Sequence, residues 1–272
     1  MTDRLFVVGN PVSHSLSPFI HNYWLGQYEI NGIYEIKRIE NVSALADIVA
    51  RVRKGEVKGV NVTVPHKEAI LPHLDALTPA AQVVGAANVV FLRDGAAIGD
   101  NTDAEGFYAG LLGAIPHFDG RGKTATLVGA GGAARAALWA LQENGFSRVY
   151  VHNRTREKAE RLAADFPAVA RVRRDDSPPT DLLANVTSLG MVGQNALRLN
   201  HAWVTPGGIV YDIVYRPRVT PLLADAKEAG LRVVGGLTML ERQAAAAFRR
   251  WYGIMPEKSE ELMAKLVECA EV

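Results

Sequence analysis

The segment TATLVGAGGAARAALWALQENG, residues 124–145, constrains the fold of this chain more than any other stretch. An apolar run ending at Val128 predicts a buried strand, GAGGAA at residues 129–134 predicts a tight turn, and the alanine-rich run after it predicts a helix. RVYVHNRT at residues 148–155 predicts the next strand. This order is typical of a dinucleotide-binding α/β domain, in which Gly129 permits the tight turn. The alternative is a glycine turn kept only for close packing.

The end of the second predicted strand indicates which dinucleotide binds. An NAD site usually has an acidic residue there that accepts a hydrogen bond from the ribose 2′-OH, but this chain has Asn153, Arg154 and Thr155. A guanidinium can bind a 2′-phosphate bidentately, and Lys158 adds positive charge one helical turn later. The pattern favours NADP. In the alternative, Arg154 is a solvated surface residue and Thr155 is only the cap of the following helix.

Strands and helices alternate through the first hundred residues. Strands are predicted in RLFVVGN, GIYEIKRI and VKGVNVTV, and helices in SPFIHNYWLGQY and ALADIVARVR. Residues 67–84 are expected to be mostly helical, and NVVFLRDGAAIGD predicts a hairpin that turns at Asp94 and Gly95. Ser17 is expected to cap the first helix, with Pro18 at its first position. The pattern predicts an α/β domain.

A second α/β unit is predicted to begin near residue 105. GFYAGLLGAI predicts a helix that leads into the glycine-turn segment, and DLLANVTS, GIVYDIVY and LRVVGG predict further strands. The stretch RRDDSPPTD at residues 173–181 predicts a surface loop. Two helices are expected in the tail, from MLERQAAAAFRRWYG to ELMAKLVECAEV.

Composition excludes several classes of protein. The 272 residues carry a formal net charge of +1 without a long run of one sign, so we expect no nucleic-acid or anionic-membrane partner. No apolar segment approaches the roughly 20 residues that cross a bilayer, and the start does not resemble a signal peptide. Cys269 is the only cysteine, which excludes an internal disulfide and a multi-cysteine metal site. These features predict a cytoplasmic protein without a metal. We expect a monomer or homodimer, although the sequence does not reveal which.

Polar side chains gather where the predicted strands of the first half end. They lie in the motifs SHSLSP, NVTVPHK, AANVV and GDNTD, and include Ser13, Ser15, Ser17, Asn61, Thr63, Lys67, Asn88, Asn101 and Asp103. Ligands of open α/β sheets bind beyond the carboxyl ends of strands, and these groups suit a small polyhydroxylated acid. Taken singly, each has a structural alternative, as a helix cap, a turn residue or an exposed ion pair.

The chain resembles the shikimate dehydrogenase family over nearly its whole length. The motifs that carry the resemblance are, in order, GNPVSHSLSPFIHN, GVNVTVPHKEA, AANVV, GDNTDAEGF, VGAGGAARA, NRT, ANVTSLGM, YDIVY, and GLTMLERQAAAAF before WYG. The resemblance implies an α/β fold of two domains with a cleft between them. The substrate domain would comprise residues 1–104 and 239–272, and a Rossmann-type NADP-binding domain would comprise residues 105–238.

The resemblance also implies roles for individual residues. Lys67 and Asp103 are implied as the catalytic pair. The implied substrate-binding residues are Ser15, Ser17, Thr63, Lys67, Asn88, Asp103 and Gln243. The implied NADP-binding residues are Gly129, Ala130, Gly131, Gly132, Ala133, Asn153, Arg154, Thr155, Lys158, Thr187, Ile213 and Gly236. The chain departs from the family pattern at Glu241 and Arg242, and His66 is interpreted as structural.

The reaction implied by the resemblance is the NADPH-dependent reduction of 3-dehydroshikimate to shikimate, in the pathway to chorismate and the aromatic amino acids. Lys67, as an ammonium, would donate a proton to the developing oxyanion, while Asp103 holds Lys67 and a substrate hydroxyl. The rivals are a quinate or aminoshikimate dehydrogenase of the same family and a catalytically silent NADP-binding sensor. A folate-type methylene dehydrogenase shares the two-domain plan but does not suit SHSLSP and GDNTD.

Overall fold

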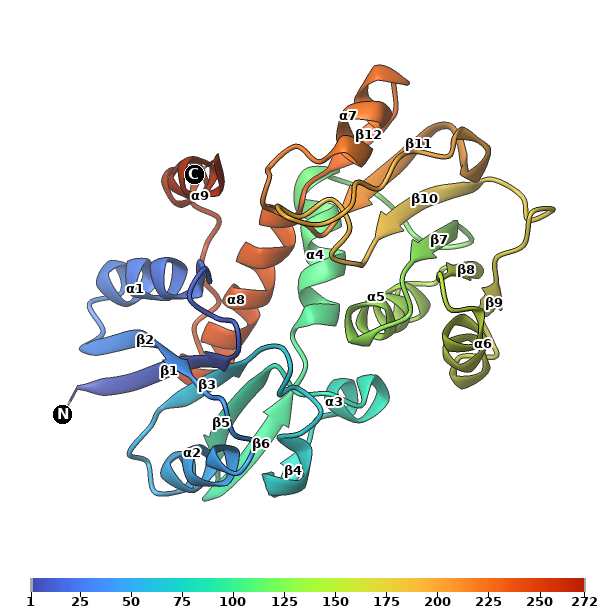
Figure 1. Ribbon diagram of the computed structural model, residues 1–272. Coiled ribbons are helices and arrows are strands. Elements are labelled where there is room, and N and C mark those ends of the chain that lie inside the picture. Colours follow the sequence, from blue (N-terminus) through green and yellow to red (C-terminus); the bar gives the residue numbers. More distant parts are fainter. Residues whose placement is uncertain (1, 272) are drawn as a thin grey trace. The chain divides into compact units, whose positions relative to one another are not determined.

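A computed structural model describes residues 2–271, which divide into two compact units. Unit 1 comprises the chain up to Thr102 together with Gln243–Ala264, and unit 2 comprises Asp103–Arg242 together with the chain from Lys265 onward. Each unit has its own six-stranded sheet (Figure 1). No helix within residues 2–271 is long and apolar enough to span a membrane.

The sheet of unit 1 is mixed and has the strand order β2-β1-β3-β5-β6-β4. Its strands are β1 (Asp3–Gly9), β2 (Gly32–Arg38), β3 (Gly59–Val62), β4 (Ala76–Leu77), β5 (Val89–Arg93) and β6 (Ala96–Asp100). β5 and β6 form the predicted antiparallel hairpin. Asp94 and Gly95 both have positive φ, 51° and 79°, as a two-residue turn of the primed type requires. This prediction is therefore confirmed.

Helices cover both faces of this sheet because successive strand residues point to opposite sides. Val60 and Val62 of β3 belong to one apolar core with α2 (Ala44–Arg53). On the other face, Trp251 of α8 (Gly236–Tyr252) packs directly on Gly59. α1 (Ser17–Gln27) joins α8 there through aromatic contacts such as those of Trp24 and His21.

Two local predictions in unit 1 are wrong. Ser17 lies inside α1, the cap position is Leu16, and the hydroxyl of Ser15 instead accepts a hydrogen bond from the Ser17 amide at 3.2 Å. Residues 67–84 are only partly helical, with a 3₁₀ helix at Leu71–His73, strand β4, and α3 (Pro79–Val84). The backbone amides of Asp75 and Thr78 donate to carbonyls within β6, so pairing with a distant strand overrides the helical pattern.

The sheet of unit 2 is parallel throughout, in the order β12-β11-β10-β7-β8-β9. Its strands are β7 (Thr124–Val128), β8 (Arg148–His152), β9 (Ala170–Val172), β10 (Thr180–Asn185), β11 (Val204–Asp212) and β12 (Arg232–Val234). Its helices are α4 (Asp103–Ala114), α5 (Gly132–Glu143), α6 (Arg156–Asp165) and α7 (Pro221–Glu228), with a 3₁₀ helix at His201–Trp203. α8 and α9 (Glu260–Glu271) contribute residues to both units.

The strand order of unit 2 positions its site. The sequence runs outward from β7 through β8 and β9, then returns to β10 on the other side of β7. Such a reversal leaves a crevice at the carboxyl ends of the two central strands, where doubly wound sheets bind dinucleotides. Leu222 of α7 packs on Val210 of β11, while Phe107 of α4 stacks on Tyr211, so helices cover both faces and leave this edge for a ligand.

Candidate active site

The predicted glycine turn lies at the carboxyl end of β7. Gly129 has a φ of 127°, and a Cβ there would lie 2.8 Å from Cγ2 of Thr187, which follows β10. Glycine is therefore required for both conformation and contact. A Cβ at Gly131 or Gly132 would meet no described atom within 4 Å, so this backbone is open to an approaching group. Ala134, in the first turn of α5, is fully buried.

The helix that follows suits a phosphate. Gly131 is the N-cap of α5, and the first turn contains no acidic side chain. The unpaired N–H groups and the positive end of the helix dipole favour an anion there. The open glycine backbone lets a pyrophosphate come close, so the residues from Gly129 to Ala133 fit the diphosphate of a dinucleotide.

The end of β8 lacks a carboxylate. Asn153 Nδ2 donates to the carbonyl oxygen of Thr155 at 2.8 Å, which shapes the turn into α6. Thr155 occupies the N-cap position as predicted, but its side chain makes no capping hydrogen bond. Arg154 is exposed beside them. A hollow of about 620 Å³ adjoins this turn, and His152, Asn153, Arg156, Arg173, Arg174, Asp175 and Asp176 are among its lining residues.

Three further residues predicted to bind the cofactor come from separate segments of unit 2. Thr187 follows β10, Ile213 follows β11, and Gly236 begins α8. A Cβ on Gly236 would lie 2.1 Å from the carbonyl oxygen of Ile213, so those two residues are in close contact. Thr187 contacts the glycine turn. The structure thus brings the four segments to one edge of the sheet.

In unit 1, the segments after β1 and β3 lie together. The amide of Thr63 donates to the Val8 carbonyl at 2.9 Å, and a Cβ at Gly9 would lie 2.3 Å from Cγ2 of Thr63. Ser17 is 7% exposed, and its backbone amide donates a hydrogen bond to the Ser15 hydroxyl. The predicted structural role of His66 is confirmed, since its Nε2 lies 2.8 Å from the Ile39 carbonyl oxygen in the interior.

Asn88 is the centre of a buried amide network in unit 1. Its Nδ2 donates to Thr102 Oγ1 at 3.0 Å, and its Oδ1 accepts from the Thr102 amide at 2.8 Å. Gln243 Oε1 lies 3.5 Å from Asn88 Nδ2, although the two residues are 155 positions apart. Asn61 donates through its Nδ2 to the Asn88 carbonyl oxygen, and its Oδ1 accepts from the Tyr34 hydroxyl at 2.6 Å.

Some of these residues were missed as supports of the site. Tyr34 lies outside the site motifs, and Thr102 lies within GDNTD but was not singled out, because their importance comes from contacts with Asn61 and Asn88. The proposed proton donor is linked to the same region through its backbone, where the Lys67 carbonyl accepts from the Ala87 amide at 2.8 Å. Lys67 belongs to unit 1, whereas Asp103 is the first residue of α4 in unit 2.

The departure from the family pattern ahead of Gln243 is an ion pair. Glu241 is 3% exposed, and its Oε2 lies 3.0 Å from Nε of Arg242. A buried carboxylate with a neighbouring guanidinium is far less costly than an unpaired one. Both residues belong to unit 2, while Gln243 begins the second segment of unit 1.

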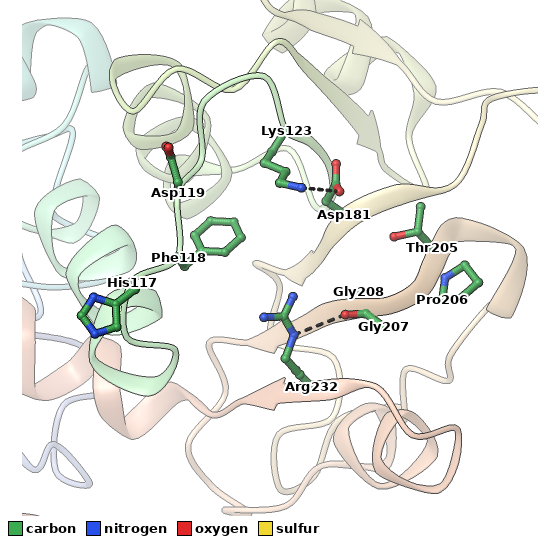
Figure 2. A pocket seen from close by; sticks show the side chains of 10 residues that line it. All are labelled: His117, Phe118, Asp119, Lys123, Asp181, Thr205, Pro206, Gly207, Gly208 and Arg232. Atoms are coloured by element: carbon green, nitrogen blue, oxygen red, sulfur yellow. Dashed lines mark hydrogen bonds and ion pairs between the residues drawn. The ribbon is translucent and has the colours of Figure 1, made fainter.

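A second hollow, of about 410 Å³, lies at the opposite edge of the unit 2 sheet (Figure 2). Its charged side chains hold the edge together. Asp181 Oδ2 accepts from the amide and hydroxyl of Thr124 at 2.9 and 3.0 Å, and Lys123 Nζ lies 3.3 Å from Asp181 Oδ1. Arg232 Nε donates to the Gly207 carbonyl at 3.3 Å. These contacts join β7 to β10 and β11 to β12, so we assign them a structural role.

The fold and the site geometry together define a class of protein. A parallel sheet with a glycine turn at its switch point is typical of dinucleotide binding, and unit 1 supplies a separate cluster of hydroxyls and amides around Asn88. Within residues 2–271, no group of three metal-ligating side chains occurs. These features are typical of an oxidoreductase that uses a nicotinamide dinucleotide and acts on a small polar substrate.

Comparison with known proteins specifies the family. Residues 7–90 match the family model for the shikimate dehydrogenase substrate binding domain, and residues 114–178 match that for shikimate / quinate 5-dehydrogenase. The shikimate dehydrogenase (NADP(+)) of Methylobacterium radiotolerans is 45% identical, covering 98% of this chain and 97% of the relative. The chain belongs to the shikimate dehydrogenase family. The relatives named shikimate dehydrogenase (NADP(+)) are NADP-dependent oxidoreductases.

Solved structures agree with this assignment. Shikimate 5-dehydrogenase from Thermus thermophilus, in complex with NADP(H) and shikimate, has a TM-score of 0.87 and 40% identity, covering 99% of this chain and 100% of that one. Ligand-free 5-ketofructose reductase of a Gluconobacter strain has a TM-score of 0.89 and 30% identity, covering 98% of each chain. The predicted two-domain α/β fold and NADP as the cofactor are confirmed.

Proposed function

We propose that this protein catalyses the reversible reduction of 3-dehydroshikimate to shikimate with NADPH, as a step of aromatic amino acid synthesis in the cytoplasm. The observation that carries the proposal is the network around Asn88, which places two side-chain amides together at the carboxyl edge of the unit 1 sheet. Amides there can donate to and accept from ring hydroxyls. A relative that is 40% identical has a structure in complex with both NADP(H) and shikimate.

The substrate would be held by groups of different chemistry. Ser15 and Ser17 follow β1, where their hydroxyls donate to the ring carboxylate. Thr63, Asn88 and Gln243 bind ring hydroxyls. Thr102 sets the Asn88 amide in place, so this side chain loses little conformational freedom when a ligand binds.

Lys67 is the proposed proton donor. As an ammonium it stabilises the negative charge that develops on the carbonyl oxygen and transfers a proton to it. Asp103 is the second proposed catalytic residue and accepts a hydrogen bond from a substrate hydroxyl. The backbone bond between Ala87 and the Lys67 carbonyl fixes the base of the lysine beside Asn88.

The cofactor residues are assigned from unit 2. NADPH, when bound, supplies the hydride. Backbone N–H groups from Gly129 to Ala133 hold the diphosphate, and Arg154 with Lys158 and the Asn153–Thr155 turn holds the 2′-phosphate. Thr187, Ile213 and Gly236 line the nicotinamide side. The protein contributes alignment and exclusion of water, and the chemistry of hydride transfer belongs to the cofactor.

Lys67→Met tests the central role, since it keeps the length of the side chain and removes the charge and the donors. We expect kcat with saturating NADPH and 3-dehydroshikimate to fall roughly 10²–10⁴-fold, the range for general acid–base catalysis. KM should change less because the hydroxyl and amide contacts remain. Lys54→Met, at an exposed position just after α2, is the matched control. A folded Lys67→Met protein that keeps most of its kcat would remove Lys67 from the mechanism.

Substrate choice has a second candidate, because a 5-ketofructose reductase shares this fold at 30% identity and one matched family model names quinate. Reduction of 3-dehydroshikimate, 3-dehydroquinate and 5-ketofructose should be measured side by side with NADPH and NADH. We expect 3-dehydroshikimate with NADPH to give the highest kcat/KM. A higher value for either rival substrate would replace the proposal. Binding of NADP without turnover of any of them would favour a silent sensor.

A further inference from the structure

A buried carboxylate at the carboxyl ends of β10 and β11 has no part in the roles assigned above. Asp212 is the last residue of β11, and its side chain is fully buried. No lysine or arginine within residues 2–271 forms an ion pair with it. Burial raises the pKa of the Asp212 carboxyl, while three hydrogen bonds favour its charged form. A buried carboxylate without a cationic partner is costly, and its hydrogen bonds must offset that cost.

Three neutral donors converge on the two oxygens of Asp212. Oδ1 accepts from Asn185 Nδ2 at 2.9 Å and from the backbone amide of Val214 at 3.0 Å. Oδ2 accepts from Thr220 Oγ1 at 2.6 Å. The donors come from the end of β10, from the segment after β11, and from the N-cap of α7. One carboxylate thus joins three separate segments.

Asn185 extends this connection to the other loop of the site. Its Oδ1 accepts from the hydroxyl and the amide of Thr187 at 2.6 and 3.1 Å, and its Nδ2 also donates to the Leu189 carbonyl at 2.9 Å. The Ile213 amide donates to the Asn185 carbonyl at 3.1 Å. Both backbone and side-chain groups therefore hold the segments that carry Thr187 and Ile213 in one arrangement.

We propose that Asp212 is a positioning residue, whose carboxylate locks the segments after β10 and β11 so that Thr187 and Ile213 face the nicotinamide end of the bound dinucleotide. The inference rests on the proposed function, in which those two residues line the nicotinamide. It extends that function, because the Asp212 carboxylate would align the nicotinamide ring without contacting it. Thr187 contacts the glycine turn and Gly236 contacts Ile213, so a shift at Asp212 would reach the whole edge.

The experiment compares two probes of the cofactor site by calorimetric titration. NADPH occupies the whole site, whereas 2′,5′-ADP carries the adenosine and 2′-phosphate without the nicotinamide. For Asp212→Ala we expect Kd for NADPH to rise about tenfold and Kd for 2′,5′-ADP to stay within about twofold. Single-turnover reduction of 3-dehydroshikimate should slow about 100-fold, the usual effect of a misplacement of about 1 Å.

Two further variants separate positioning from general stability. Asp212→Asn keeps one oxygen for Asn185 and Val214, and its amide can donate to Thr220, so NADPH binding should stay within about threefold of the unmodified protein. Thr220→Val removes the donor on the α7 side and the cap for Leu223, so it should lower the melting temperature but leave the single-turnover rate nearly unchanged. If Asp212→Ala does not fold, Asn185→Ser replaces it with the same expectations.

The outcomes distinguish a failure of the role proposed for Asp212 from a failure of the proposed function. Equal weakening of NADPH and 2′,5′-ADP by Asp212→Ala would show a merely structural role and overturn the inference. So would an Asp212→Ala protein with an unchanged single-turnover rate. An unmodified protein that binds neither probe would overturn the proposed function, and the inference with it.

Discussion

At the end of β8, the exposed side chain of Arg154 is the one that we propose to meet the adenosine ribose of the cofactor. Arg154 stands where an acidic residue would select NAD, and the Asn153–Thr155 hydrogen bond fixes the turn around it. Cofactor binding removes water from the guanidinium. A charge-assisted hydrogen bond to an anion such as a 2′-phosphate offsets the cost of that desolvation. Cofactor preference should therefore depend strongly on this residue.

Arg154→Ala should reduce the preference for NADP over NAD. We expect the unmodified protein to favour NADP at least about tenfold in kcat/KM, because a charge-assisted hydrogen bond contributes roughly 1.5–3 kcal/mol. The variant should raise KM for NADP much more than KM for NAD. Arg156→Ala in the first turn of α6 is a neighbouring control, since Arg156 Nε is already bound to Glu160 at 2.9 Å. Equal use of both cofactors by the unmodified protein would contradict this prediction.

His21 illustrates a buried titratable group that works against stability in acid. Its ring is 1% exposed and stacks on Tyr34 with centroids 4.4 Å apart. Burial lowers the pKa of His21 from 6.5 to about 3, although the Asn61 side chain opposes the shift. Below pH 6.5 the unfolded chain binds a proton that the folded chain does not, so the free energy of unfolding falls as pH falls toward 3.

His21→Phe should make stability less dependent on pH while keeping an aromatic ring in the cluster. Between pH 7 and pH 5 we expect the unmodified protein to lose about 2 kcal/mol through His21, and the variant to lack that loss. Urea unfolding at both pH values measures the difference. His201→Asn, at an exposed position, serves as the control. An unchanged pH dependence in His21→Phe would show that the ring is protonated in the folded state.

At the scale of elements, the packing of α8 on the unit 1 sheet depends on Gly59, which has no side chain. A Cβ on Gly59 of β3 would lie 2.0 Å from Nε1 of Trp251. The same indole nitrogen donates to the Val90 carbonyl of β5 at 3.1 Å, so it cannot move away without losing a buried hydrogen bond. This contact holds α8 on the sheet, through the part of the helix after Gln243 that belongs to unit 1.

Gly59→Ala should therefore destabilise the protein, by about 1–3 kcal/mol, as overpacking does in a dense core. The same substitution at Gly26, near the end of α1, meets no described atom within 4 Å and should stabilise by up to about 1 kcal/mol through helix propensity. Chemical denaturation of the two variants gives the comparison. A Gly59→Ala protein as stable as the unmodified one would mean that Trp251 has room to shift.

At the scale of the whole molecule, the chain crosses between its two units more than once. The final turns of α9 belong to unit 2, where an Nη of Arg216 donates to the Cys269 carbonyl and Arg218 lies 3.4 Å from Glu271. The resemblance placed the whole tail from residue 239 in the substrate domain. By the observed division α9 has residues in both units.

The two ligands should stabilise the protein through different units. At 100 times its Kd, either NADP or shikimate should add about 2.7 kcal/mol to the free energy of unfolding, if it binds only the folded chain. Arg154→Ala should lose most of the rise in melting temperature caused by NADP but keep that caused by shikimate, and Ser15→Ala should show the reverse. Thermal melts with each ligand measure this. Loss of both shifts in either variant would contradict the assignment of the two ligands to separate residues.

Much of the fold was determined by local sequence. The β5–β6 hairpin follows from Asp94-Gly95, because few other residue pairs adopt two positive φ values. The bounds of α2 match its apolar spacing, and the strand–turn–helix order around Gly129 identifies the unit 2 fold. Residue type and spacing also marked the site segments, because ligands of such sheets lie at strand ends.

Only the tertiary structure decided which of those segments meet and what supports them. Local pattern favoured a helix over residues 67–84, but pairing of β4 with β6 interrupts it. Gln243 joins Asn88 across 155 positions, and Asp212 joins the ends of two strands to the cap of α7. Such contacts depend on strand order and on burial, whereas sequence patterns record only the few residues on either side. The sequence therefore determined the units and their motifs, and the tertiary structure determined the networks that hold the motifs in position.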